Sequence, residues 1–274
     1  MRLQAIVVCV LAIFAAACQT APASAPPTLA ALQGDYFRLE SAALGRPMHI
    51  YVSLPENYAR ETRTYPTIYI TDGDSLFPLL APTHLFLTYD EPTPPAILVG
   101  IAYGTFGEGN MRHVDFRWPS PEAPDRGAAA YQRFLADEVI PEIERRFRSD
   151  PQRRVLIGQS RGGGFVLYSA LTAPDLFWGR IASNPAMRPL EAFQGDAAPA
   201  TRRDLGLFVA SGERDHEDLR REVQAWTQTW SARAERPWDF NAVSLENGTH
   251  AATIGEVYRR GLIWLFRNEA GTAD

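Results

Sequence analysis

Apolar and polar residues follow one another along this chain in short blocks, and these blocks predict strands and helices in turn. Short runs of apolar, β-branched and aromatic residues are typical of strands, and longer runs with an apolar residue every three or four positions predict helices. We expect strands at 36–41, 48–54, 65–70, 96–101, 153–157, 180–183, 205–211 and 239–245. We expect helices at 75–87, 127–148, 165–173, 217–235 and 255–267, with a long polar loop at 102–125.

The order of these elements predicts the fold class. The first two strands flank Gly45-Arg46-Pro47, so we interpret them as an antiparallel hairpin. Later strands alternate with helices, which is typical of a mostly parallel sheet. We therefore expect an α/β fold: a mostly parallel central sheet, an N-terminal antiparallel hairpin and helices on both faces. Pro141, within the 127–148 segment, predicts a kink or a break in that helix.

The first residues have the composition of an export signal. Arg2 precedes an apolar run, 5–17, that is too short to cross a bilayer comfortably. This run leads into FAAAC, ending at Cys18, which resembles a bacterial lipobox, in which the cysteine is lipidated and becomes the new N-terminus. The alternative is ordinary cleavage after one of two small-residue triplets, 15–17 or 21–23. We favour lipidation of Cys18.

The cysteine content agrees with lipidation. The only cysteines, Cys9 and Cys18, lie in the leader, so no disulfide can form in the rest of the chain. The acyl chains on a lipidated cysteine would hold the protein on a membrane, at about 0.8 kcal/mol per buried CH₂ group. Gln19 follows the cysteine, which in bacterial lipoproteins suits the outer membrane. We therefore expect an exported outer-membrane lipoprotein on the periplasmic face of the envelope.

Composition divides the chain into three parts and excludes several partners. We expect a signal peptide at 1–17, a flexible tether rich in Ala, Pro and Ser at 18–33, and one α/β domain at 34–274. The formal net charge of −5 gives no reason to expect nucleic acid as a partner. The chain contains no lysine, so no lysine can take part in catalysis. The five histidines are scattered, without metal-binding spacing, so neither a metal nor another cofactor is indicated.

A G-x-S-x-G motif, GQSRG from Gly158 to Gly162, lies between a predicted strand and a predicted helix. In this context the motif is typical of a nucleophile elbow. The sharp turn holds the serine in a strained conformation with its Oγ clear of the sheet, and glycines on either side let the backbones pass closely. The alternative is a glycine-rich turn with an incidental serine. We favour Ser160 as the nucleophile.

A serine hydroxyl needs a base, and the base needs an acid that orients it. Two of the five histidines, His49 and His84, fall in a predicted strand and a predicted helix, while His113 and His216 fall in loops. His250 follows the last strand, in a loop at the carboxyl edge of the sheet, where it would face the elbow. We therefore favour His250 as the base.

The acid is expected after the strand that ends at Ser211. Asp215 lies at the mouth of this strand, with Glu213 as the alternative acid. Asp215 could instead cap the following helix, with Asp218 at the third helical position. We favour Asp215 as the acid of a Ser–His–Asp triad.

A tetrahedral oxyanion needs two fixed N–H donors. We expect one from the backbone of Arg161, the residue after the nucleophile. We expect the other after the third strand, where the N–H of Asp74 is well placed. Asp72-Gly73 in that loop also has the composition of a simple turn, and both interpretations can hold together.

Five segments, taken in order, resemble the putative-esterase branch of the α/β hydrolases, which includes siderophore trilactone esterases, esterase D and mycolyltransferases. The segments are IYVSLP at 50–55, YITDGD at 69–74, VGIAY at 99–103 with RHVDF at 112–116, the elbow, and GTHAA at 248–252. The likeness covers roughly 36–266 and is closest to the trilactone-esterase-like group.

The resemblance implies an α/β-hydrolase fold and supports the same site residues. It assigns Ser160 as nucleophile, His250 as base, and the N–H groups of Asp74 and Arg161 as oxyanion donors. The acid position corresponds to Asp215, where relatives often carry Glu.

The resemblance also suggests a substrate pocket that includes Tyr103, Arg112 and Asp115. We expect Arg112 and Asp115 to form an ion pair that shapes the pocket wall or stabilises the loop. The guanidinium of Arg161 would favour an anionic or phenolate substrate if it faces the site. Otherwise it is a surface side chain of which only the backbone matters.

The leading hypothesis is a serine esterase that hydrolyses a carboxylic ester or lactone through an acyl-Ser160 intermediate. The family resemblance suggests a siderophore-like small molecule as substrate. An acyltransferase with an alcohol acceptor would use the same triad, and competing acceptors would separate the two activities. A non-catalytic, envelope-tethered binding protein is the third hypothesis, which a fluorophosphonate probe would test.

Overall fold

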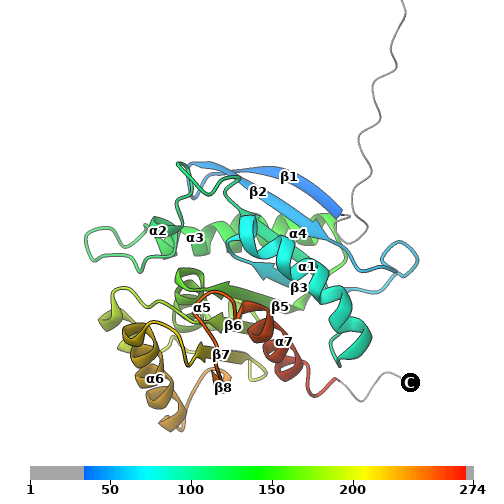
Figure 1. Cartoon of the computed structure of the whole chain (residues 1–274). Coiled ribbons are helices and arrows are strands. Elements are labelled where there is room, and N and C mark those ends of the chain that lie inside the picture. The colour runs from blue at the N-terminus through cyan, green and yellow to red at the C-terminus, as the bar shows by residue number, and fades with distance from the viewer. Residues whose placement is uncertain (1–33, 270–274) are drawn as a thin grey trace, which may run out of the picture.

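A twisted sheet runs through the centre of the molecule, with helices on both of its faces (Figure 1). The structure is a computed structural model that describes residues 34–269; the leader, the tether and Cys18 lie outside these residues. The strands are β1 Gly34–Ser41, β2 Arg46–Ser53, β3 Tyr65–Ile70, β4 Ile97–Ala102, β5 Ser149–Gln159, β6 Gly179–Ser183, β7 Gly206–Gly212 and β8 Asp239–Leu245. The helices are α1 Gly73–Asp90, α2 Arg112–Asp115, α3 Ala128–Arg133, α4 Ile140–Arg146, α5 Arg161–Thr172, α6 Glu217–Ala232 and α7 Ile254–Leu265.

The strand order is β1-β2-β4-β3-β5-β6-β7-β8. Strands β1 and β2 form an antiparallel hairpin, and β2 also pairs antiparallel with β4. Every other pair in the described sheet is parallel. The predicted α/β-hydrolase architecture is therefore confirmed, including the hairpin that opens it.

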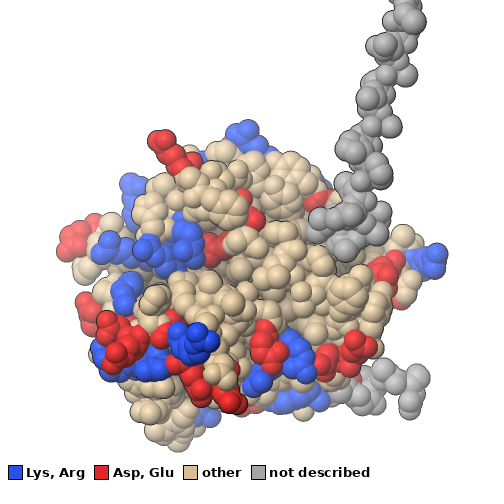
Figure 2. All heavy atoms as spheres, in the orientation of Figure 1, with Lys and Arg blue, Asp and Glu red and all other residues tan. Residues whose placement is uncertain are grey.

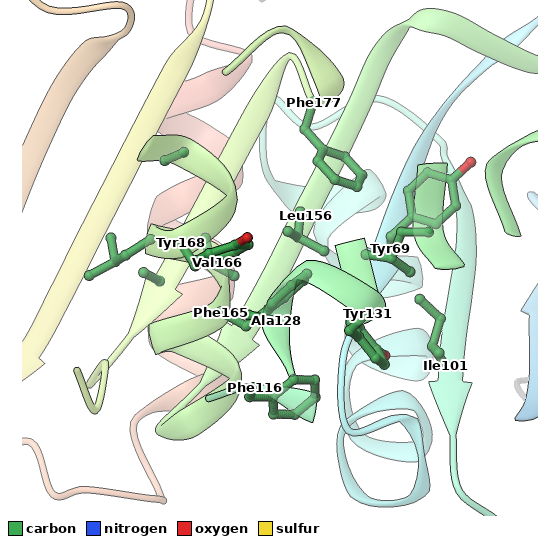
Figure 3. Close-up of a cluster of buried hydrophobic side chains, with 14 of the residues drawn as sticks. Tyr69, Ile101, Phe116, Ala128, Tyr131, Leu156, Phe165, Val166, Tyr168 and Phe177 are labelled. Atoms are coloured by element: carbon green, nitrogen blue, oxygen red, sulfur yellow. The ribbon is translucent and has the colours of Figure 1, made fainter. Parts of the chain in front are cut away.

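Two apolar clusters, one on each face, hold the helices against the sheet. Helices α1 and α7 pack on one face, around buried residues such as Ile70, Leu80 and Val257. Helices α3 to α6 pack on the other face, where the rings of Phe116, Tyr131 and Phe165 are labelled in Figure 3. The Tyr131 ring meets the other two edge-on, with centroid distances of 5.0 Å each. Because strands in this sheet have apolar residues on both sides, the parallel part is buried on both faces.

Several element boundaries differ from those that the sequence predicts. The predicted helix at 127–148 consists of α3, a π-helical turn at Phe134–Val139, and α4 with Pro141 in its first turn, so the predicted break is confirmed. The loop predicted at 102–125 contains the short helix α2. Helix α5 begins at Arg161, four residues before the predicted start at 165, and α6 ends at Ala232. Within the described part of the chain, no helix is long and apolar enough to cross a membrane.

Candidate active site

The G-x-S-x-G motif forms a sharp turn between β5 and α5. Ser160 has φ 58° and ψ −118°, a conformation that is strained for a residue with a side chain. Its N–H donates to the carbonyl of Ser183 at 2.9 Å, and its own carbonyl accepts from Gly164 and Ala186, each at 2.9 Å. The backbone on both sides of the serine is therefore fixed by hydrogen bonds.

Close contacts, one with the backbone and one with a side chain, explain why the motif contains glycine at both ends. A Cβ atom on Gly158 would lie 2.3 Å from the carbonyl oxygen of Gly162, and one on Gly162 would lie 2.6 Å from Thr71 Oγ1. Both distances are far shorter than any real Cβ contact. The turn therefore needs hydrogen at both positions, as the elbow interpretation expects.

The structure brings Ser160, His250 and Asp215 into one hydrogen-bonded line. His250 Nε2 lies 2.9 Å from Ser160 Oγ, and His250 Nδ1 lies 2.7 Å from Asp215 Oδ1. The Asp215 side chain is completely buried, while one quarter of the His250 side chain is exposed. The three residues come from the carboxyl ends of β5, β7 and β8, which meet at one edge of the sheet. This is the arrangement of a nucleophile, a base and an orienting acid.

Neither alternative for Asp215 is realised in the structure. The residue that caps α6 is His216, and its N–H donates to Asp215 Oδ1 at 2.6 Å, so Asp215 does not cap that helix. Glu213 has an exposed side chain, and its N–H pairs with the carbonyl of Leu245. The carboxylate that bonds His250 is therefore that of Asp215.

The other four histidines do not bond to Ser160. His84 is buried on α1, and burial lowers its pKa from 6.5 to about 4, so it is neutral at pH 7. His49 lies in β2 and His113 in α2. His216 is exposed at the rim of the site, with its ring centroid 5.4 Å from that of His250.

Two side chains that the sequence analysis did not assign hold the His250 loop. Gln159 Nε2 and Asn184 Nδ2 both donate to the carbonyl of His250, at 2.6 and 3.0 Å. Asn184 also bonds Thr253 Oγ1 at 2.7 Å and accepts the N–H of Gly212 at 2.7 Å. Its φ of 41° is a left-handed conformation that asparagine tolerates well. An asparagine directly after β6 was the signal that could have identified it.

The two expected oxyanion donors lie at helix N-termini. Asp74 lies in the first turn of α1 and Arg161 is the first residue of α5, where backbone N–H groups have no partner within the helix. These ends also carry the positive part of the helix dipole. The Asp74 carboxylate accepts the N–H groups of Tyr103 and Gly104 at 2.7 and 2.8 Å, which fixes the start of α1 against the end of β4.

The expected ion pair between Arg112 and Asp115 is wrong. Arg112 instead makes a bidentate pair with Asp72, at 2.7 and 2.8 Å. Asp115 pairs with Arg46 and accepts the hydroxyl of Tyr103 at 2.9 Å. Although Arg112 and Asp115 are three residues apart on α2, Asp115 is buried while Arg112 is partly exposed, and their side chains take different partners.

Burial and ion pairing act in opposite directions on these carboxylates. Burial raises the pKa of Asp72, and the adjacent Arg112 guanidinium lowers it. Burial likewise raises the pKa of Asp115, and Arg46 lowers it. Burial also raises the pKa of the Tyr103 phenol, which therefore stays protonated and donates to Asp115.

A cavity of about 250 Å³ opens beside the elbow. Arg112 and Gln159 line it, together with Phe106, whose side chain is 76 % exposed. Tyr103 and Asp115 are buried and do not line this cavity, so of the three expected pocket residues only Arg112 does. Among residues 34–269, no group of three or more His, Cys, Asp or Glu side chains is arranged to hold a metal ion.

The mostly parallel sheet, with a nucleophile elbow after β5 and a histidine after its last strand, defines an α/β hydrolase. Residues 41–255 match the family described as "Putative esterase", and the chain belongs to this family.

Two curated relatives resemble this chain over about half of its length. The chain is 35 % identical over 158 residues to the ferri-bacillibactin esterase BesA of Bacillus subtilis (52 % of this chain, 54 % of that protein). It is 32 % identical over 168 residues to the siderophore triacetylfusarinine C esterase of Aspergillus fumigatus (56 % of each). The chain thus spans about half the length of these curated relatives.

Solved structures show the same fold at lower identity. The BES protein from Bacillus cereus has a TM-score of 0.74 at 21 % identity, covering 90 % of this chain and 99 % of that one. An IroE-like serine hydrolase from Shewanella oneidensis has a TM-score of 0.75 at 22 % identity, covering 86 % and 81 %.

Proposed function

We propose that this protein is a serine esterase that hydrolyses a carboxylic ester or lactone through an acyl-Ser160 intermediate. The observation that carries this proposal is the continuous line from Ser160 Oγ through His250 to Asp215, at 2.9 and 2.7 Å, on a strained turn. The family membership and the esterase names of its relatives support the same chemistry.

Each step follows from the geometry of the site. His250 Nε2 takes the proton of the Ser160 hydroxyl as Oγ attacks the ester carbonyl carbon. The N–H groups of Arg161 and Asp74 stabilise the oxyanion of the tetrahedral intermediate. As the intermediate collapses, the ester C–O bond breaks, and the alcohol leaves with the proton from His250. Water then attacks acyl-Ser160 by the same route and releases the carboxylic acid, while Asp215 keeps the imidazole in the required tautomer.

A siderophore-like ester or lactone is the substrate class that we propose. Two relatives, about one third identical to this chain over the matched segment, are named as esterases of the siderophores ferri-bacillibactin and triacetylfusarinine C. The Arg112 guanidinium lines the 250 Å³ cavity, but it is paired with Asp72, and Asp74 lines the cavity as well, so Arg112 supplies no free positive charge there. The Arg161 side chain is exposed directly after the nucleophile, and we assign it as the cation for an anionic or phenolate group of the substrate.

The esterase proposal is tested by turnover of short p-nitrophenyl esters. We expect Ser160→Ala to lower kcat/KM by about a thousandfold or more. The matched control is Ser231→Ala, which removes an exposed hydroxyl on α6 and should leave kcat/KM within about twofold. Unchanged turnover in Ser160→Ala would contradict the proposal. A panel of linear esters and cyclic trilactones, with and without iron, tests the substrate class separately.

We also propose that the protein is exported and anchored through a lipid on Cys18. The lipobox-like FAAAC and the absence of any cysteine after Cys18 support this placement. Metabolic labelling with a palmitate analogue should mark the protein, and Cys18→Ser should abolish the label. Labelling that persists in Cys18→Ser, or cleavage after 21–23 without a label, would contradict the anchor.

A further inference from the structure

The outward side of helix α1 is apolar and exposed. Leu79, Phe86 and Tyr89 are 48 %, 63 % and 58 % exposed. Their spacing, with the partly exposed Pro82 between them, places all four on one side of the helix. We call these four residues the α1 face. Figure 2 shows that the surface over α1 carries charged side chains only at its margins.

The α1 face has no charged residue of its own, and its one polar contact is between the Tyr89 hydroxyl and the Glu56 carboxylate. No Asp, Glu, Arg or Lys stands between Asp74 and Asp90, near the two ends of the helix. His84 is buried and neutral, because burial lowers its pKa to about 4. The Thr83 hydroxyl donates to the carbonyl of Leu79 at 2.8 Å, so it is satisfied within the helix. A helix that is apolar on both sides is typically covered on both sides.

Aromatic rings also pack on the other side of α1, towards the hairpin. The Tyr51 ring lies 5.9 Å from that of Phe77 on α1 and 5.2 Å from that of Tyr36, whose side chain is 53 % exposed. Phe77 lies two positions from Leu79 and therefore on the opposite side of the helix, so the α1 face is a surface of α1 alone. Large apolar side chains exposed together on one side of a helix are typical of an interaction site.

The chain enters the described domain next to α1. Gly34, the first described residue, lines a hollow of about 530 Å³ together with Ala81 and Leu85 of α1. The proposed lipid anchor at Cys18 is separated from Gly34 by 15 residues, which span at most about 55 Å when fully extended. A domain held this close to a bilayer contacts it repeatedly, and the surface around Gly34, where the tether joins the domain, makes these contacts.

We infer that the α1 face docks on the surface of a lipid bilayer, with Phe86 and Tyr89 at the boundary between headgroups and acyl chains. Aromatic side chains are enriched at this boundary, where an apolar ring and a polar edge are both accommodated. Interfaces with protein partners are typically enriched in arginine and contain several hydrogen bonds, whereas this face has no arginine and only the hydroxyl of Tyr89, which bonds Glu56. Because it carries no cation, the docking does not require anionic lipids. The inference rests on the proposed envelope placement and not on the ester chemistry.

Vesicle binding tests the inference on the chain from Gln19 to Asp274, which lacks the leader and the acyl chains and keeps every described residue. We expect this chain to float with phosphatidylcholine vesicles, equally at about 0.05 and about 0.5 M NaCl, because no charge attraction is involved. Removing the α1 face should lower the partition coefficient at least about tenfold. The test variant is Leu79→Ser/Phe86→Ser/Tyr89→Ser, and the matched control on the exposed side of α6 is Gln224→Ser/Gln228→Ser/Thr229→Ser.

The outcomes separate the possible occupants of the face. Binding that is lost in the α1 variant and kept in the α6 control supports the bilayer. A parent chain that does not float overturns the inference. The inference is also overturned if the parent chain does not bind vesicles and sediments as a dimer while the α1 variant sediments as a monomer. In that case a second copy of the chain covers the α1 face. Phe86→Ser alone replaces the triple variant if that one does not fold. No ester is used, so either result leaves the esterase proposal standing.

Discussion

The contact between Asp215 and His250 shows what a single carboxylate contributes to this site. Asp215 Oδ1 accepts from His250 Nδ1 at 2.7 Å, which leaves Nε2 unprotonated and directed at Ser160 Oγ. In Asp215→Asn the amide can present an N–H to Nδ1 and so favour the wrong tautomer. We expect kcat to fall by about 10²–10⁴-fold with little change in KM.

The control for this prediction is Glu213→Gln, since Glu213 is exposed and only its backbone is bonded. Steady-state kinetics on one ester should show kcat within about twofold of the parent. If Glu213→Gln loses activity and Asp215→Asn keeps it, the acid has been assigned to the wrong residue.

At the scale of single residues, the catalytic triad could be predicted from the sequence. The residues that hold the triad and its surroundings in place could not. Ser160 has a motif, and His250 and Asp215 each follow a strand in the required order. Asn184 and the partner of Arg112 have no such signature. The pair between Arg112 and Asp72 joins residues 40 positions apart, and Asp72 has a left-handed φ of 53°. Only the folded backbone shows which groups these side chains reach.

The elbow depends on close approach between β5 and α5. A Cβ on Gly158 would lie 2.3 Å from the Gly162 carbonyl oxygen, and backbone atoms cannot move aside as a flexible side chain can. We therefore expect Gly158→Ala to lower the free energy of unfolding by about 3 kcal/mol and to lower the activity of the folded fraction. Urea unfolding followed by circular dichroism measures the first effect, and ester turnover measures the second.

Gly255→Ala is the matched control, because an added Cβ at Gly255, in the first turn of α7, meets no atom within 4 Å. This change should be neutral or should stabilise the protein by up to about 1 kcal/mol, since alanine favours helix. A Gly158→Ala protein as stable and active as the parent would show that the elbow tolerates a side chain there.

Predictions of whole elements succeeded where one physical signal was dominant. β3 and β8 have the predicted bounds because β3 is a run of apolar and β-branched residues, and in β8 polar and apolar residues largely alternate between Pro237 and Asn247-Gly248. The start of α5 could not be predicted, since Gly162, Gly163 and Gly164 oppose helix formation by intrinsic propensity. Tertiary packing overrides that preference. The start of α5 packs so closely on neighbouring backbone that Cβ atoms on Gly163 and Gly164 would lie 2.8 and 2.3 Å from the carbonyl oxygens of Ser183 and Ala186, so only glycine fits at these two positions.

For the molecule as a whole, one buried histidine links stability to pH. His84 on α1 shares a hydrogen bond of 2.9 Å between its Nδ1 and the Tyr258 hydroxyl on α7. Burial lowers its pKa from 6.5 to about 4. Between these values the unfolded chain binds the proton and the folded chain does not, so stability falls as the pH falls. The expected loss between about pH 7.5 and about pH 4.5 is about 2–3 kcal/mol.

Urea unfolding at both pH values tests this prediction against two variants. His84→Gln cannot bind the proton, so its free energy of unfolding should fall by about 2–3 kcal/mol less than that of the parent over the same range. The exposed His113→Gln is the control and should keep the pH dependence of the parent. Equal pH dependence in His84→Gln and in the parent would mean that His84 is not held neutral by the fold.

The central claim is that Ser160 carries the acyl group during turnover. The most direct measurement is rapid quenching of the protein with a p-nitrophenyl ester, followed by mass spectrometry of its peptides. The account predicts a single acyl adduct on Ser160, at a level matching the burst of p-nitrophenol, absent in Ser160→Ala and strongly reduced in His250→Ala. Steady hydrolysis with no adduct on Ser160 during the burst, or with the adduct on another residue, would contradict it.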